Sequence, residues 1–101
     1  MKWIEEIKVQ IDQTEAYNFE NILQQLFKDI QENADCEGLS KAAYYHDPGI
    51  SGFYMIHIFW HVKSSKEQWS RLGLRLTQIL KEFGWVTHSV WIESKCVVPK
   101  D

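Results

Sequence analysis

The sequence lacks the features of membrane-spanning proteins and of disulfide-stabilised secreted proteins. No apolar run approaches the roughly 18 residues that can span a bilayer. The first ten residues, MKWIEEIKVQ, place acids where a signal peptide has its apolar segment. The two cysteines, Cys36 and Cys96, have no Cys-x-x-Cys spacing and are too few for a disulfide scaffold, so we expect free thiols. These absences predict a cytoplasmic protein that does not bind membranes.

The chain also has no strong excess of charge. It carries 11 basic and 14 acidic side chains, which gives a net charge of -3 at pH 7. Residues 1–37 hold nine acids and three bases, whereas the remainder holds five acids and eight bases. This asymmetry favours association of two copies, but it is too mild to indicate a surface that binds nucleic acid.

Apolar and aromatic residues, by contrast, are plentiful. Of the 101 residues, 45% are hydrophobic, and the aromatic residues include five Trp, five Phe and four Tyr. A chain of this length forms one compact domain with one core. We assign that domain to residues 1–93, and we expect residues 94–101 to form a C-terminal tail that is either a loose end or a short arm.

Hydrophobic periodicity predicts elements in the order β-α-β-β-α-β. Apolar residues recur with a period of two over residues 3–11, which indicates a strand with one buried face. The apolar face of the first helix consists of Phe19, Ile22, Leu23, Leu26, Phe27 and Ile30. Residues 39–47 form a second strand, and the turn formers that follow join it in a hairpin to residues 53–62. Residues 85–93 form the last strand.

The segment FYMIHIFWHV, residues 53–62, is apolar enough to be a buried helix or a strand. It follows a glycine-containing turn, it is rich in aromatic and β-branched residues, and a capping-box sequence over residues 64–68 starts a helix directly after it. We therefore predict a strand. The helix that follows is expected to stop at Gly84. Its apolar stripe consists of Trp69, Leu72, Leu76, Ile79, Leu80 and Phe83.

His57 and His61 lie four residues apart in this segment, a spacing that can chelate a metal ion on a helix. Residues four apart are about 6 Å apart on a helix, but they are roughly 13 Å apart on a strand, which is too far for one ion to bridge. We therefore predict no metal site. We interpret the two histidines as interface or packing residues.

The element order is the split βαβ pattern of an α+β, ferredoxin-like fold. Right-handed crossovers then place both helices on one face of a four-stranded antiparallel sheet. Along residues 53–62, the row expected to face the helices is Tyr54, Ile56, Ile58, Trp60 and Val62. The row expected to face away from them is Phe53, Met55, His57, Phe59 and His61. An exposed row with three large apolar residues usually marks a contact surface, so we predict a homodimer whose sheets pack face to face through it.

With these elements in place, the chain resembles the dimeric α+β barrel superfamily, and more specifically the antibiotic biosynthesis monooxygenase-like domains. The resemblance covers roughly residues 3–93 and rests on the element order, on the helix sequence RLGLRLTQILKEFGW and on the final strand sequence THSVWIE. The packing signatures are Leu72-Gly73, Gly84 and Val90-Trp91. The resemblance implies two sheets that meet as a barrel and a small pocket between the helices and the sheet of each subunit. Members include cofactor-independent oxygenases, haem-degrading enzymes and many domains of unknown role.

The resemblance also implies what the pocket contains. The haem-degrading branch uses a histidine on the second helix and an asparagine on the first strand. This chain has no histidine over residues 64–84, and the region of its first strand offers only Gln10 and Gln13, so we expect no haem and no other cofactor. The residues expected at the pocket are Trp60, Trp69 and Tyr54. For Trp60 and Trp69 the alternative, which is the commoner role of such residues, is packing in the core.

His88 is the candidate catalytic residue. If it shares a face with Val86, Val90 and Ile92, a neutral imidazole there can abstract a proton from a small phenolic or enolic substrate. The alternative is a core histidine bonded to a backbone carbonyl. The activity expected from the resemblance is therefore that of a cofactor-independent monooxygenase-like protein with a small aromatic ligand.

Two other functions are consistent with the same topology. RNA-recognition domains place aromatic residues on the third strand after a base and a glycine, but here Ser51 stands where the base is needed, so RNA binding is less favoured. A dimeric ligand-binding or accessory domain without chemistry competes evenly with the enzyme.

Overall fold

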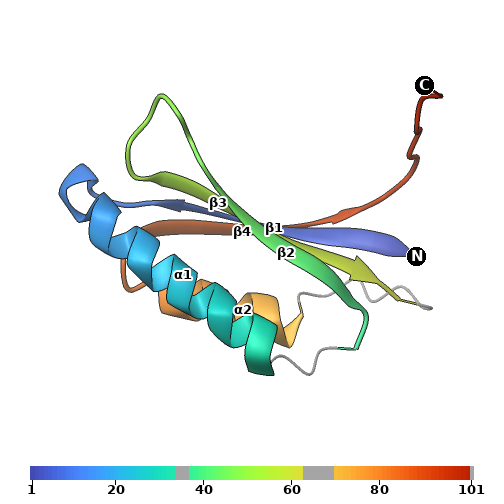
Figure 1. The fold of residues 1–101 in the computed structure, drawn as a ribbon, viewed down its shortest axis with the longest axis horizontal. Helices are drawn as coiled ribbons and strands as arrows, with labels where there is room; N and C mark the ends of the chain where they lie inside the picture. Colours follow the sequence, from blue (N-terminus) through green and yellow to red (C-terminus); the bar gives the residue numbers. More distant parts are fainter. Residues whose placement is uncertain (34–36, 63–69, 101) are drawn as a thin grey trace.

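The structure is a computed structural model that describes residues 1–33, 37–62 and 70–100. Its elements, in chain order, are β1 (Lys2–Gln10), the short 3-10 helix η1 (Gln13–Glu15), α1 (Ala16–Asn33), β2 (Leu39–His46), β3 (Phe53–His61), α2 (Arg71–Leu80) and β4 (Trp85–Ile92). The four strands form one antiparallel sheet in the order β2-β3-β1-β4. Both helices lie on the same side of this sheet (Figure 1). The ferredoxin-like α+β fold predicted from the sequence is therefore confirmed.

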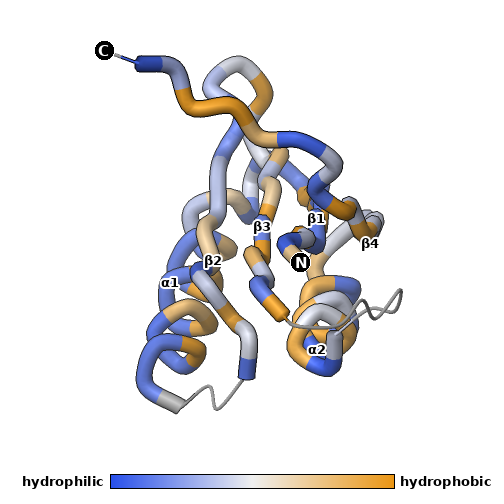
Figure 2. The backbone as a smooth tube through the Cα atoms, turned by 90° about the vertical axis from the view of Figure 1, so that its right-hand side faces the viewer, coloured by the Kyte–Doolittle hydropathy of each residue, from blue (hydrophilic) through white to orange (hydrophobic). Residues whose placement is uncertain are grey.

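The core fills the space between the sheet and the helices. Its buried hydrophobic residues are Trp3, Ile7, Val9, Ile11, Phe19, Leu23, Tyr54, Ile56, Ile58, Trp60, Leu76 and Leu80. They come from alternate positions of β1 and β3 and from one face of each helix, as period-two and period-3.6 patterns require. Figure 2 shows hydrophobic and hydrophilic positions interspersed along these central strands.

Residues 53–62 were the ambiguous segment, and the strand predicted there is confirmed as β3, which covers Phe53–His61. Tyr54, Ile56, Ile58 and Trp60 are buried against the helices. The alternating residues Phe53, Met55, His57 and Phe59 are partly buried on the opposite face, and His61 is exposed. The sheet thus has a helix-covered face and an open face.

The second helix differs from its prediction at both ends. It begins at Arg71 with Ser70 as N-cap, and the sequence 64–68 that was expected to cap it lies outside the described residues, as does Trp69. It ends at Leu80 rather than at Gly84, because a turn over residues 81–83 precedes that glycine. Cys36 also lies outside the described residues, whereas Cys96 is an exposed free thiol.

The tail after β4 extends away from the rest of the chain. Glu93 donates its backbone N–H to the carbonyl of Lys2 at 2.9 Å, and no regular secondary structure follows it up to Lys100. In Figure 1 the tail leaves beyond the end of β4 and rises on the side of the sheet away from the helices. None of the helices described is long and apolar enough to cross a membrane.

Candidate functional site

A fully buried carboxylate lies on the helix-covered face of the sheet. Glu5 is 0% exposed and occupies the row of β1 that also holds Trp3 and Ile7. A buried charge is costly unless hydrogen bonds and opposite charges compensate it. The sequence analysis missed Glu5. The available signal was the gap at position 5 in the period-two row of apolar residues, where a glutamate replaces the expected hydrophobic side chain.

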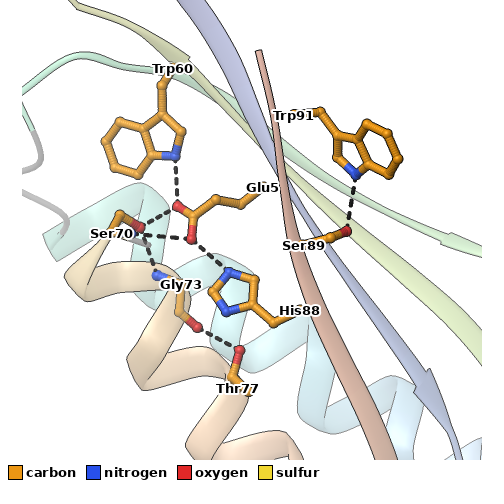
Figure 3. Close-up of polar contacts among 8 residues, drawn as sticks. All are labelled: Glu5, Trp60, Ser70, Gly73, Thr77, His88, Ser89 and Trp91. Carbon is orange, nitrogen blue, oxygen red and sulfur yellow. Dashed lines mark hydrogen bonds and ion pairs between the residues drawn. The ribbon is translucent and has the colours of Figure 1, made fainter. Parts of the chain in front are cut away.

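Three side chains and one backbone group surround the Glu5 carboxylate (Figure 3). Oε1 accepts the indole N–H of Trp60 at 2.8 Å and the hydroxyl of Ser70. Oε2 lies 2.7 Å from Nε2 of His88 and accepts the backbone N–H of Ser70 at 3.2 Å. Both oxygens therefore have two partners each, which offsets the cost of desolvating the charge.

Strand register explains why these groups meet. Glu5 is paired with Ile58 on β3 and with Val90 on β4. Trp60 and His88 are each two residues from those partners, so both are diagonal neighbours of Glu5 on the same face. The structure thus brings together two of the residues singled out from the sequence, with a carboxylate between them.

The first turn of α2 contributes the remaining groups of the site, on the helix-covered face of the sheet. The Ser70 hydroxyl accepts the backbone N–H of Gly73 at 2.9 Å, which caps the helix, and donates to Glu5 at the same time. A Cβ atom at Gly73 would collide with Oε2 of Glu5 and would lie 3.0 Å from Nε2 of His88. The glycine therefore allows the first turn of the helix to approach the carboxylate. The hydroxyl of Thr77 bonds the carbonyl of Gly73 at 2.7 Å and closes this turn.

The contact between Glu5 and His88 involves Nε2 of the imidazole ring. Nε2 lies 2.7 Å from the carboxylate oxygen, so the tautomer with its hydrogen on Nε2 donates to Glu5. The side chains of the pair are 0% and 6% exposed, so the contact is shielded from water. A carboxylate that holds an imidazole in this way orients it for proton transfer.

A stack of two indoles borders the site. The rings of Trp3 and Trp60 lie 5.4 Å apart and only 16° from parallel. Nε1 of Trp3 is buried and has no hydrogen-bond partner, the one such side-chain nitrogen or oxygen among the residues described. Trp3, which borders the site, therefore has a hydrogen-bond donor that the described part of the protein leaves unused.

Tyr54 lies apart from this site. It is six residues from Trp60 on an extended strand, which corresponds to roughly 20 Å. Its hydroxyl donates to the carbonyl of Ala16 at 3.2 Å, and its ring contacts Phe19 at 5.1 Å between centroids. Burial, followed by the nearby charge of Glu20, raises the pKa of Tyr54 above its usual value. The geometry therefore separates Tyr54 from Trp60 and His88.

An open groove runs along the outer edge of the sheet, on the far side from His88. Its volume is about 620 Å³, and it lies between α1 and β2. Its lining residues are Gln24, Phe27, Lys28, Ile30, Gln31, Leu39, Ser40, Lys41, Ala42 and Tyr44. Since β2 and β4 are opposite edges of the sheet, this groove and the Glu5–His88 pair are separate sites.

The open face of the sheet carries polar contacts among its aromatic residues. Glu6 lies 3.1 Å from His57 and 3.6 Å from Lys8, and the His57 ring contacts the rings of Tyr45 and Phe59. Two tryptophans of β4 that the sequence analysis did not assign to the open face, Trp85 and Trp91, are 84% and 57% exposed. In Figure 3, Trp91 and Ser89 lie on the opposite side of β4 from His88.

The sequence matches no family model and no curated protein, but the fold matches solved structures. It is similar to SnoaB, a cofactor-independent oxygenase from Streptomyces nogalater, with a TM-score of 0.69, 9% identity, and coverage of 95% of this chain and 96% of that one. It is similar to a protein of Deinococcus radiodurans proposed to be an antibiotic biosynthesis monooxygenase (TM-score 0.70, 10% identity, 98% and 99% covered). A conserved protein from Methanosarcina mazei also matches, with a TM-score of 0.64, 17% identity, and 90% and 91% covered.

These likenesses span nearly the full length of each chain at low sequence identity, so they establish the fold. The chain therefore has the ferredoxin-like α+β fold of the antibiotic biosynthesis monooxygenase-like structures, as its sequence predicts.

Proposed function

We propose that this protein is a homodimeric, cofactor-independent oxygenase that deprotonates a small aromatic or enolic substrate with the Glu5–His88 pair. The observation that carries the proposal is the 2.7 Å contact between Oε2 of Glu5 and Nε2 of His88 on the helix-covered face of the sheet. The likeness in fold to a cofactor-independent oxygenase supports the same reaction class.

The pair acts as a general base. It takes a proton from an acidic C–H or O–H of the substrate, and the Glu5 carboxylate stabilises the imidazolium that forms. The resulting anion is electron-rich enough to reduce molecular oxygen directly. For an activated methylene group the balanced reaction is CH₂ plus O₂ giving C=O plus H₂O, in which one oxygen atom enters the substrate and the other leaves as water.

The indole pair supports recognition of such a substrate. The buried N–H of Trp3 has no acceptor among the described residues, and a ligand oxygen would satisfy it. Trp60 is held in place by its hydrogen bond to Glu5, so it links the aromatic surface to the base.

Oxygen uptake tests the proposal. The purified protein is mixed in air with a panel of small phenols and enolisable 1,3-diketones, and oxygen consumption is followed with an electrode. A His88→Gln variant should lose about a hundredfold or more of the rate, as expected for removal of a general base. The matched control is His46→Gln, at an exposed histidine on the end of β2. Absence of uptake with every compound, or full uptake by the His88→Gln variant, contradicts the proposal.

The second candidate is a dimeric ligand-binding or accessory domain without chemistry. It is favoured by the groove between α1 and β2, which is open and lies away from the buried pair. Saturable binding of the same phenols without oxygen uptake, unaffected by His88→Gln, identifies this function.

The dimer itself is part of the proposal. The open face presents Phe53, Met55, His57, Phe59 and His61 as predicted, and Trp85 and Trp91 extend the same aromatic surface. A second copy that offers the same face covers it in a twofold-symmetric contact.

A further inference from the structure

The indole of Trp3 is a buried donor without an acceptor beside the carboxylate site. Trp3 is 6% exposed, and its Nε1–H has no hydrogen-bond partner among the residues described. Folded proteins satisfy nearly all of their buried polar groups, because a buried donor without an acceptor has lost its hydration without compensation. An indole N–H can only donate a hydrogen bond, so the group that satisfies it must be an acceptor such as a carbonyl oxygen.

Trp3 lies next to Glu5 along β1. The two are alternate residues on the same face of the strand, so their Cα atoms are roughly 7 Å apart. Trp60 lies against both: its ring stacks on that of Trp3, with 5.4 Å between the centroids, and its own N–H donates to Oε1 of Glu5. The N–H of Trp60 is therefore used to hold the carboxylate, whereas that of Trp3 has no such use among the described residues.

A ligand can approach Trp3 from the side of β4. Trp3 is the register partner of Ile92, the last residue of β4, so the two side chains share the helix-covered face. Ile92 is 44% exposed. Helix α2 begins at Arg71, and its N-cap Ser70 is bonded to Glu5, so the helix starts level with the carboxylate. The exposed end of β4 therefore leaves solvent close to the Trp3 indole.

We propose that Nε1 of Trp3 is a specificity-determining donor, which binds a carbonyl oxygen of the substrate while the Glu5–His88 pair faces the acidic group. This inference rests on the proposed function and narrows its substrate class. Because the donor and the carboxylate belong to alternate residues of one strand, the preferred substrate is a small aromatic hydroxy-ketone whose carbonyl and acidic hydroxyl are about one ring apart. A simple alkylphenol can meet the base but leaves the Trp3 donor unsatisfied.

A cycle between one protein group and one ligand group tests this role. The ligands are para-hydroxyacetophenone and para-ethylphenol, which share the ring and the hydroxyl, but only the first has a carbonyl. Their dissociation constants are measured by isothermal titration calorimetry for the wild type and for Trp3→Phe, which keeps an aromatic ring against Trp60 and removes the N–H. The preference for the ketone, expressed as the ratio of the two constants, should fall by at least about tenfold in Trp3→Phe, as expected when a buried donor loses its acceptor.

Two comparisons control for other effects. The two phenols differ in acidity, but this difference cancels, because each ligand is compared with itself in both proteins. Tyr17→Phe is the matched control variant: it removes a donor from an exposed aromatic side chain on α1 and should leave the ratio unchanged.

NMR of the wild-type protein, isotope-labelled in its tryptophan indoles, gives a readout that does not depend on the folding of a variant. The N–H resonance of Trp3 should move downfield with para-hydroxyacetophenone and much less with para-ethylphenol, because only the ketone offers a carbonyl acceptor. The internal reference is Trp91, whose N–H donates to Ser89 on the opposite side of β4 and should respond to neither ligand (Figure 3).

The outcomes separate this inference from the proposed function. A ratio that is the same in the wild type and Trp3→Phe overturns the role of Trp3, whatever the oxygen uptake. If Trp3→Phe does not fold, a Trp3 resonance that responds equally to both ligands does the same, and so does a wild type that binds neither ligand. Failure of the general base is measured independently, by the oxygen uptake of His88→Gln. A fall in the ratio together with a selective shift of the Trp3 resonance supports the inference.

Discussion

The imidazole of His88 and the carboxylate of Glu5 meet at 2.7 Å, with Glu5 fully buried and His88 almost so. Glu5→Ala removes the acceptor shared by Trp60, Ser70 and His88 and leaves their donors buried. We expect it to lower the free energy of unfolding by about 3–5 kcal/mol, as when one partner of a buried pair is removed. Urea unfolding at neutral pH measures the change.

The control for this change is Glu82→Ala, at an exposed glutamate in the turn after α2. It should alter the free energy of unfolding by no more than about 0.5 kcal/mol. A similarly small effect of Glu5→Ala would show that the carboxylate does not hold these elements together.

Gly73→Ala tests the close approach of α2 to Glu5. Alanine favours a helix over glycine by about 1 kcal/mol, so substitution on an unobstructed helix is stabilising. Here the added Cβ collides with Oε2 of Glu5, and we expect a net loss of about 1–3 kcal/mol in the free energy of unfolding. Thermal or urea unfolding measures it.

A double-mutant cycle identifies the cause. In the Glu5→Ala background the collision is absent, so Gly73→Ala should become neutral or stabilising. Gly49→Ala is the matched control, because a Cβ there meets only Oδ1 of Asp47 at 3.5 Å, an ordinary contact. Equal losses for Gly73→Ala in both backgrounds would mean that the helix does not contact Glu5.

Tyr54 makes stability depend on pH at the alkaline end. Burial, with a smaller contribution from the charge of Glu20, raises its pKa in the folded chain. The unfolded chain therefore ionises first, at about pH 10, and the folded chain only at higher pH. The stability contributed by neutral Tyr54 is fully present below about pH 10 and is lost as the pH rises through the folded-state pKa.

The measurement compares the wild type with Tyr54→Phe. The difference in their free energies of unfolding should be constant below about pH 10 and should then shift against the wild type. The remaining tyrosines are common to both proteins and cancel in the difference. A difference that stays constant through this range would show that Tyr54 ionises equally in both states.

Periodicity was sufficient to predict the fold but not the site. The alternation in residues 53–62 and the helical spacing after Asn18 depend on which side chains avoid water, and this is visible in the sequence. The carboxylate site depends instead on register: Trp60 and His88 meet at Glu5 only because both strands flank β1 with a particular offset. Glu5 is the one polar residue in the buried row of β1, and an analysis that looks for apolar residues does not identify it.

The end of the second helix shows a second limit of prediction from the sequence. Gly84 was predicted to stop the helix, because glycine is the usual residue after a helix end. The chain leaves the helix after Leu80, and Gly84 is instead required where the backbone enters β4. A Cβ atom there would collide with the carbonyl oxygen of Gln10. The sequence analysis identified Gly84 as a structurally important glycine but assigned it the wrong role. The need for a glycine comes from Gln10, 74 residues earlier in the sequence, and local sequence patterns contain no information about such a distant contact.

If the open face is the contact surface of the proposed dimer, a charge placed on it should weaken the dimer. Met55 lies on that face, with Lys8 as its register partner on β1 and Tyr45 on β2. Met55→Lys places a second ammonium group beside Lys8 in the surface that the proposed dimer would bury. We expect the dimer dissociation constant to rise by at least about tenfold, because a buried charge without a partner costs several kcal/mol. Tyr17→Lys is the control, since Tyr17 is 85% exposed on α1 and away from this face. Analytical ultracentrifugation measures both variants, and an unchanged dissociation constant for Met55→Lys would place the dimer contact on another surface.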